Sequence, residues 1–341
     1  MRKIAVFLLG CLLYLPAVFS QEWEDFFVPI DTLKFANFNA DTLAFDLESS
    51  LLVPFFTKLE SAATDTLQNI SILHIGGSHV QAGTMSHRIR QNILAAYPDA
   101  VGGRGLIFPY SVAKKCNNPA DYKVKGSRTF GLTRNVQKEL DRNLGMTGIA
   151  VYTDTFSEIR FTLNDPTLPF ATDTIVVFGY DECNTMAPCL IVNDLGFEPV
   201  RIDSASRRFV YTCPNYTQEF TLQFNVDSGN VFTLTGVQLI SRNAGITFHS
   251  IGVNGASVPS YLSCLNFEQD LQWIHPDLVI FGIGINDAAG NNFDTLEFKN
   301  NYLKLIKRIR KVNPDCAFIF ITNNDSYKKT GRKRVVNKNG L

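Results

Sequence analysis

Residues 70–83 read ISILHIGGSHVQAG, and the rest of the predicted architecture follows from this segment. Its first half alternates and is rich in β-branched residues, which predicts a buried strand. Gly76 and Gly77 then allow a sharp turn of the backbone, and Ser78 stands at that turn. The next residues, 84–97, have apolar side chains at helical spacing, at Met85, Ile89, Ile93 and Leu94. The segment therefore predicts a strand, a glycine turn with a serine, and a helix.

The position of Ser78 has two interpretations. Ligands of open α/β sheets bind at the carboxyl edge of the sheet and near helix N-termini, which favours Ser78 as a nucleophile. A serine at the start of a helix also commonly caps that helix with its side chain. Both interpretations stay open on residues 70–83 alone.

The composition limits the class of protein. The chain has 341 residues, of which 32 are basic and 32 are acidic. Hydrophobic residues make up 45% of the chain. This supply of apolar residues is enough for a large core, and the length fits one large or two ordinary domains. The balanced charge argues against nucleic acid as the main partner.

The N-terminus has the pattern of a secretory signal. Arg2 and Lys3 precede the apolar residues 4–18, and residues 18–20 resemble a cleavage site. The apolar run is too short for a membrane span, so we expect no transmembrane segment after cleavage. Cys11 lies in a run that superficially matches a lipidation box, but the hydrophobic segment continues past it. We therefore expect an exported protein, periplasmic or extracellular.

Six cysteines remain after removal of the signal. Cys183, Cys189 and Cys213 fall in one β-rich region, where an exported chain can form a disulfide. Cys264 and Cys316 lie in apolar patterns and are expected as buried thiols. No C-x-x-C pair is present, and we predict neither a metal site nor a cofactor.

The pattern changes between residues 119 and 245. Short alternating runs recur there without helices between them, which indicates a β-sandwich or jelly roll. The runs are 149–152, 158–163, 174–178, 189–192, 208–212, 219–226 and 231–240. Modules of this kind often bind sugars. Tyr180, Tyr211 and Tyr216 are candidates for stacking on a sugar or for ordinary core and surface positions.

An α/β pattern returns after residue 245. Residues 246–252 predict a strand, and Pro259 opens a helix that carries Leu262, Leu265 and Leu271. The apolar run within 276–287 predicts a strand covered on both faces, as in a parallel sheet. A capping-box pattern at 294–297 opens a helix to Val312, and 316–322 is a further buried strand. We expect a surface loop at 98–118 and a solvated basic loop at 328–338.

The predicted fold is therefore an α/β parallel sheet interrupted by an inserted β-sandwich. The predicted parts are a signal peptide at 1–20, an N-terminal arm at 21–69, a first α/β part at 70–118, the inserted module at 119–245 and a second α/β part at 246–341.

Three predicted strand ends carry groups suited to acyl transfer, namely Ser78, Gly255 and Asn286. Acyl transfer needs a nucleophilic hydroxyl, a base, and donors aimed at the developing oxyanion. The backbone N–H groups of Ser78 and Gly255, with the side-chain amide of Asn286, would make three such donors. Each residue follows a predicted parallel strand, so the ordered trio predicts an acyl-transfer site.

The same residues resemble the GDSL or SGNH hydrolases. Gly76-Gly77-Ser78 is similar to the Gly-Asp-Ser block of that family, Gly255 to its second block, and residues 284–287 to its Gly-x-Asn-Asp block. The resemblance implies a flavodoxin-like α/β/α sandwich. It also implies that Ser78 is the nucleophile and that the other two blocks supply oxyanion donors. The layout, with a β insert before the second block, resembles peptidoglycan O-acetylesterases of the bacterial envelope. In that case the insert is similar to a carbohydrate-binding module.

Two features depart from the family pattern. Gly77 stands where the family has aspartate, which is expected to loosen the turn that holds Ser78. The family's late Asp-x-x-His block has no match either. None of the five histidines, His74, His79, His87, His249 and His275, has an aspartate three residues before it. We infer from this a truncated chain that lacks its catalytic base.

The resemblance thus implies an exported serine esterase that removes O-acyl groups, chiefly O-acetyl, from cell-wall or other carbohydrate. Its partner is then an O-acylated carbohydrate or peptidoglycan substrate, and we expect little or no activity from the 341-residue chain. The alternative is a non-catalytic glycan-binding envelope protein on a decayed esterase scaffold. Whether the chain is an enzyme stays open at this point.

Overall fold

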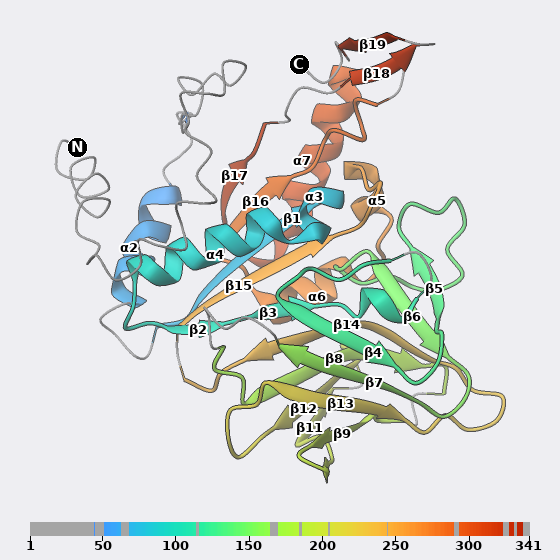
Figure 1. Cartoon of the computed structure of the whole chain (residues 1–341). Coiled ribbons are helices and arrows are strands. Elements are labelled where there is room, and N and C mark those ends of the chain that lie inside the picture. The colour runs from blue at the N-terminus through green and yellow to red at the C-terminus, as the bar shows by residue number, and fades with distance from the viewer. Residues whose placement is uncertain are drawn as a thin grey trace. The chain divides into compact units, whose positions relative to one another are not determined.

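The computed structural model contains one parallel sheet and two larger antiparallel sheets (Figure 1). It describes Ala44 and residues 51–62, 68–113, 116–163, 170–183, 186–203, 205–243, 245–289, 293–322, 327–330 and 333–336. The parallel sheet has the order β17-β16-β1-β15-β2, and all its neighbouring strands run parallel. Its strands are β1 (Ile70–Gly76), β2 (Val101–Gly103), β15 (Gly245–Gly252), β16 (Leu278–Gly282) and β17 (Ala317–Phe320).

Alternate residues of the parallel strands face two different hydrophobic clusters. Ile72 and Ile280 lie in a cluster with helix α2 (Leu52–Ala62), and helix α4 (Thr84–Ala96) packs against it. Leu73 and Phe281 lie in the other cluster, with helix α7 (Thr295–Val312). Helices α5 (Val258–Leu262) and α6 (Phe267–Ile274) contact α7 on that side. The predicted α/β/α arrangement is therefore confirmed.

The strands that lie between β2 and β15 in the sequence form two further, antiparallel sheets. One has the order β10-β9-β13-β7-β4. The other has the order β11-β12-β8-β14-β6-β5, with β3 paired to β14. The strands are β3 (Gly105–Ile107), β4 (Tyr122–Gly126), β5 (Gly131–Arg134), β6 (Ile149–Thr153), β7 (Ser157–Leu163), β8 (Thr174–Asp181), β9 (Cys189–Val192), β10 (Leu195–Phe197), β11 (Arg201–Asp203), β12 (Arg208–Thr212), β13 (Glu219–Phe224) and β14 (Phe232–Ile240). The structure thus contains the predicted antiparallel insert.

The segment 98–118 differs from the surface loop that we expected. It contains β2, which pairs with β15, then β3, which pairs with β14, and a 3-10 turn at Tyr110–Val112. Arg104, between the two strands, is only 2% exposed. Glycines hid the strand pattern here, because Gly105 has a φ of +73°, which a residue with a side chain rarely adopts. The segment carries the chain from the parallel sheet into the antiparallel one.

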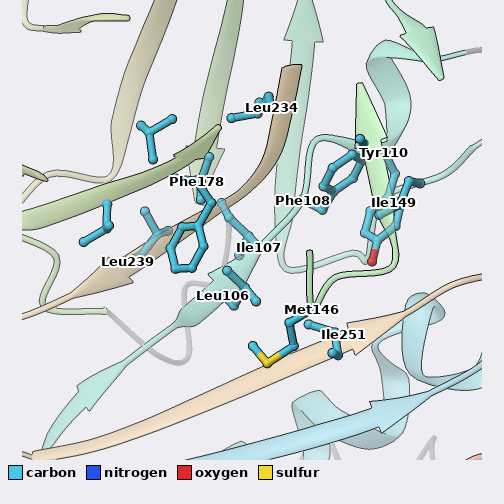
Figure 2. Packing of buried hydrophobic residues seen from close by; sticks show 14 of the residues in the cluster. Leu106, Ile107, Phe108, Tyr110, Met146, Ile149, Phe178, Leu234, Leu239 and Ile251 are labelled. Atoms are coloured by element: carbon cyan, nitrogen blue, oxygen red, sulfur yellow. The ribbon is translucent and has the colours of Figure 1, made fainter. Parts of the chain in front are cut away.

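One hydrophobic cluster joins the insert to the parallel sheet. Figure 2 shows Leu106 and Ile107 of β3 between Phe178 of β8 and Ile251 of β15. Met146, which precedes β6, lies beside Ile251 in the same cluster. The shared core means that the two parts bury apolar surface against each other.

Two sets of buried ion pairs also join the insert to the part of the chain that forms the parallel sheet. Asp121 lies 2.6 Å from Nε of Arg104 and 3.3 Å from Nη1 of Arg90 on α4. Burial opposes ionisation of Asp121, but the two guanidinium groups outweigh it and lower its pKa. Arg208 of β12 pairs with Asp270 of α6, and both side chains are about 2% exposed. Removing one partner of such a pair leaves a buried charge and costs about 3–5 kcal/mol.

Two helical predictions need correction. Residues 84–96 do form a helix, but its fully buried side chains are Ser86 and Arg90, while the predicted apolar face is only half-buried. The single helix expected after Pro259 is two helices, α5 and α6, and Leu265 between them is 71% exposed. The helix at α7 is confirmed, because the carboxylate of Asp294 accepts the N–H groups of its first turn.

Other local predictions had mixed outcomes. The basic segment includes a hairpin of β18 (Tyr327–Thr330) and β19 (Lys333–Val336) in place of the expected loop. All six cysteines are free thiols, so the possible bridge in the β-rich region is not formed, and Cys264 and Cys316 are buried as expected. The signal peptide at 1–20 and most of the arm at 21–69 lie outside the described residues.

The three candidate stacking tyrosines of the insert have different surroundings. Tyr211 is fully buried and donates its hydroxyl to the carbonyl of Pro188, so it belongs to the core. Tyr180 is half-buried, with the guanidinium of Arg207 4.3 Å from its ring centroid. Tyr216 is 52% exposed. Of the three, only Tyr216 has a largely exposed ring.

Candidate active site

The candidate site lies at the carboxyl ends of three adjacent strands. β1 is the middle strand, and its last residue, Gly76, pairs in register with Gly252 of β15 and with Gly282 of β16. The loops that follow these three glycines carry Ser78, Gly255 and Asn286. Parallel strands end at the same edge of a sheet, which is why residues so far apart in the chain meet there.

The glycines at these strand ends let the next helix lie directly on the sheet edge. A Cβ on Gly76 would stand 2.2 Å from Cγ2 of Val80. A Cβ on Gly252 would stand 2.4 Å from the backbone N of Gln81. Both contacts are with helix α3 (Ser78–Ala82), so the missing side chains fix where that helix sits.

Ser78 is the first residue of α3 and its side chain is exposed. The N-cap of the helix is Gly77, and no side chain caps it. The interpretation of Ser78 as a helix cap is therefore wrong. An exposed hydroxyl at the sheet edge is accessible to a substrate, as a nucleophile must be.

Asn286 and the loop of Gly255 lie together beside Gly77. The side-chain amide of Asn286 donates to the carbonyl of Ala256 across 2.8 Å. A Cβ on Gly77 would stand 3.3 Å from Nδ2 of Asn286 and 3.5 Å from the carbonyl oxygen of Ala256. Gly255 is exposed and has a φ of +87°. The structure thus brings the residues next to Ser78 and Gly255 into contact with Asn286.

Gln81 links the helix of Ser78 to the loop of Gly255, and sequence reasoning missed it. Its side chain is 4% exposed, and its Oε1 accepts the N–H of Asn254 at 2.8 Å. Its Nε2 donates to the carbonyl of Asn117 at 3.3 Å. The available signal was a polar side chain one turn after Ser78, on the inward face of the helix.

Asp287 links the loop of Asn286 to helix α5. Its two carboxylate oxygens lie 3.1 and 3.2 Å from the backbone N of Val258, which donates to them. Burial raises the pKa of Asp287 to about 6, while this hydrogen bond acts in the opposite direction. Asp287 and the reciprocal Ser257–Ser260 capping box both satisfy N–H groups at the start of α5.

The histidines inside the sheet are held neutral. His74 lies in β1, and its Nδ1 is 2.9 Å from Oγ of Ser86. Burial, with Arg90 as a second cause, lowers the pKa of His74 to about 4. His249 in β15 accepts the N–H of Leu106 at 3.0 Å, and burial lowers its pKa to about 3. Both side chains are committed to partners inside the fold.

The insert also reaches the candidate site. A Cβ on Gly255 would have Cγ1 of Val136 as its nearest neighbour, at 3.9 Å. Val136 follows β5 of the antiparallel sheet. The turn after β5 therefore borders the loop of Gly255.

Metal-binding clusters and membrane-spanning helices are both absent from the described residues. Within those ranges, no group of three or more His, Cys, Asp or Glu side chains is arranged to hold a metal ion. No helix in that part of the chain is long and apolar enough to cross a membrane.

Comparisons with known proteins agree with this layout. The model of the GDSL-like lipase/acylhydrolase family matches residues 225–338, which include Gly255 and Asn286 but not Ser78. A solved structure of a peptidoglycan O-acetylesterase is 21% identical, with a TM-score of 0.65, over 81% of this chain and 73% of that chain. No match was found among curated proteins.

Two carbohydrate esterases of family two are more distant. The one from Cellvibrio japonicus is 10% identical with a TM-score of 0.20, over 58% of this chain and 78% of that one. One from Clostridium thermocellum, in complex with cellohexaose, is 11% identical with a TM-score of 0.21, over 56% and 77%. Scores this low support no conclusion about the fold.

The parallel sheet, its helical layers and its strand-end loops define a three-layer α/β protein with an antiparallel insert. Within that class, the chain has the layout of an SGNH/GDSL hydrolase. The resemblance is therefore confirmed for the family layout and the fold, and the family model includes the second and third blocks but not the block of Ser78.

Proposed function

We propose that the chain is a serine esterase that removes O-acyl groups, chiefly O-acetyl, from cell-wall or other carbohydrate. The observation that carries the proposal is the meeting of the three strand-end loops, in which Asn286 bonds to Ala256 beside Gly77. Ser78 is exposed and follows Gly77, which lies beside the side-chain amide of Asn286. A hydroxyl, an amide and a glycine loop at one sheet edge are the groups that acyl transfer needs.

In the proposed reaction, Oγ of Ser78 attacks the ester carbonyl and its proton passes to water. The backbone N–H groups of Ser78 and Gly255, with the amide of Asn286, stabilise the oxyanion that forms. Collapse of the tetrahedral intermediate breaks the bond to the sugar oxygen, which takes a proton from water and leaves as the hydroxyl, and an acyl group stays on Ser78. Water then hydrolyses this acyl-enzyme and releases the carboxylic acid.

We assign no base to this reaction. His74 and His249 are buried in the sheet, and none of the five histidines has the Asp-x-x-His pattern. An oxyanion site without its base still retains part of its catalytic power. We therefore expect a low rate from this chain, measured most easily with an activated aryl ester.

The substrate class rests on the insert and on the fold. The peptidoglycan O-acetylesterase with the similar fold supports an envelope glycan as the substrate. The turn that carries Val136 borders the loop of Gly255, which supports contact between the insert and the sugar part of the substrate. Export to the periplasm or cell exterior belongs to the same proposal.

Ester hydrolysis tests the proposal. Release of nitrophenol from p-nitrophenyl acetate, and of acetate from O-acetylated peptidoglycan, is measured for the wild type and for Ser78→Ala. Ser61→Ala is the matched control, because Ser61 lies on α2 and its hydroxyl donates to the carbonyl of Thr57. We expect Ser78→Ala to fall to the blank rate while Ser61→Ala equals the wild type. Equal rates for Ser78→Ala and the wild type would contradict the proposal.

The alternative of a non-catalytic glycan-binding protein has one observation in its favour, which is the lack of an assignable base. It predicts retention on peptidoglycan without any hydrolysis that depends on Ser78. Co-sedimentation of the full chain with peptidoglycan, together with the ester assay, separates the two functions.

A further inference from the structure

Three tyrosine hydroxyls bond to the main chain at the three strand ends of the candidate site. Tyr261 donates to the carbonyl of Gly76 at 2.8 Å, at the end of β1. Tyr110 donates to the carbonyl of Gly252 at 2.9 Å, at the end of β15. The third tyrosine, Tyr302, bonds in the same way just after β16.

The hydroxyl of Tyr302 donates to the carbonyl of Ile283 at 2.5 Å. The three carbonyls precede the candidate catalytic residues by nearly the same distance along the chain. Gly76 is two residues before Ser78, Gly252 is three before Gly255, and Ile283 is three before Asn286. Each tyrosine thus holds the backbone at the point where a strand ends and its functional loop begins.

The three tyrosines come from different parts of the chain. Tyr110 lies in the 3-10 turn after β3, Tyr261 in α5 and Tyr302 in α7. Tyr110 packs edge-on against Phe108, and Figure 2 shows the two rings side by side. Tyr302 packs edge-on against Phe281 of β16. Their rings are therefore anchored in the layers around the sheet.

Burial keeps the three hydroxyls as donors. Tyr110 is 4% exposed, Tyr261 is fully buried and Tyr302 is half-buried. Burial raises the pKa of each phenol well above its ordinary value, so each keeps its proton near neutral pH. A buried carbonyl that loses such a donor is left without a partner, and the backbone shifts to find another.

We propose that Tyr110, Tyr261 and Tyr302 are positioning residues, which hold the three strand-end loops in the geometry that the acyl-transfer site requires. The inference rests on the proposed function for its catalytic consequence, but its structural part stands without it. A displacement of about 1 Å in such a site can cost about 100-fold in rate.

The test replaces each tyrosine by phenylalanine, which removes one hydroxyl and keeps the ring. Tyr211→Phe is the matched control, because Tyr211 is fully buried and donates to a carbonyl in the insert. Tyr302→Phe is the variant least prone to misfolding, since its ring is only half-buried. Two quantities are measured in the full chain: amide hydrogen exchange at the three loops, and the Ser78-dependent hydrolysis of p-nitrophenyl acetate.

We expect each of the three variants to exchange faster than the wild type in its own loop. The expected loops are 77–78 for Tyr261→Phe, 253–256 for Tyr110→Phe and 284–287 for Tyr302→Phe. We expect kcat to fall by about 10- to 100-fold with KM nearly unchanged, whereas Tyr211→Phe keeps both values.

Loop exchange that equals that of Tyr211→Phe in all three variants would overturn the proposal, and so would faster exchange with an unchanged kcat in an active enzyme. A wild type without Ser78-dependent hydrolysis overturns the proposed function alone. In that case the hydrogen exchange still decides whether the tyrosines position the loops.

Discussion

The side-chain amide of Asn286 donates to the main-chain carbonyl of Ala256 across 2.8 Å, which ties the loop after β16 to the loop after β15. The bond orients the amide and leaves its second N–H free of this contact, because a primary amide has two donors. The middle strand, β1, ends between these two loops at Gly76. The side chain of Asn286 therefore joins two of the three strand-end loops of the candidate site.

Replacing Asn286 by Ala removes both the proposed oxyanion donor and this link. We expect Asn286→Ala to lower the Ser78-dependent rate by about 10²–10³-fold, as loss of one oxyanion donor does in acyl transfer. Asn243→Ala is the control, since Asn243 is exposed and bonds to the hydroxyl of Tyr216 in the insert. Steady-state hydrolysis of p-nitrophenyl acetate measures both variants, and equal rates would exclude Asn286 as a donor.

Gly252 lies where a side chain cannot fit. A Cβ there would stand 2.4 Å from N of Gln81 and 2.6 Å from the carbonyl oxygen of Gly77, and both are backbone atoms. We expect Gly252→Ala to lower the free energy of unfolding by about 1–3 kcal/mol and to displace the helix of Ser78. In Gly196→Ala the new Cβ meets only Sγ of Cys189 at 3.4 Å, so this variant should stay within about 0.5 kcal/mol. Urea unfolding compares the two, and a Gly252→Ala protein as stable as Gly196→Ala would refute the close approach.

Gln81 should respond differently to two near-isosteric changes. Gln81→Met removes the acceptor for the N–H of Asn254, whereas Gln81→Glu keeps an oxygen in its place. We expect Gln81→Met to lose about 1–3 kcal/mol of stability and about tenfold or more in kcat. Gln81→Glu keeps the acceptor for Asn254 but loses the donor to the Asn117 carbonyl, so we expect it to lose stability as well while it keeps more of kcat than Gln81→Met.

Gln223→Met is the control for the Gln81 variants. Gln223 is half-buried on β13 and donates to the carboxylate of Glu158 in the insert. Its loss should leave kcat unchanged. If Gln81→Met and Gln223→Met have the same kcat, Gln81 does not position the loop of Gly255.

His74 and His249 should stay neutral well below the usual pKa of histidine. Their pKa values are lowered to about 4 and about 3, chiefly by burial. The folded protein therefore binds fewer protons than the unfolded chain below about pH 6.5, so the stability that they contribute is complete above that pH. It falls by about 1.4 kcal/mol per pH unit for each histidine as the pH drops toward 4.

Proton NMR of the five histidines checks this behaviour. Two imidazole Cε1–H resonances should not shift between pH 7.5 and pH 5, and they should disappear in His74→Gln and His249→Gln respectively. Titration of all five resonances near pH 6.5 would contradict the burial of these two side chains.

Much of the fold could be predicted because its signals are local. The apolar run that ends at Gly282 and the cap at Asp294 specify a strand and a helix from neighbouring residues alone. The strands within 101–107 were not predicted, because glycines there remove the side-chain alternation on which strand prediction depends. Spacing placed Leu265 on a single helix with Leu262 and Leu271, whereas it lies exposed at the break between α5 and α6.

The candidate site could be predicted only in part. Ser78, Gly255 and Asn286 stand out because each follows a strand pattern. Their supports, such as Gln81 and Tyr261, act through contacts with residues far away in the sequence. The bond from Tyr261 to Gly76 spans 185 positions, and no local pattern encodes such a pairing.

Acylation of Ser78 tests the central claim most directly. The full chain is incubated with p-nitrophenyl acetate, quenched in acid, digested and analysed by mass spectrometry, alongside Ser78→Ala. We predict one added acetyl group on the peptide that carries Ser78, and none on the corresponding peptide of the variant. Acetylation elsewhere at equal levels in both proteins, with Ser78 unmodified, would contradict it.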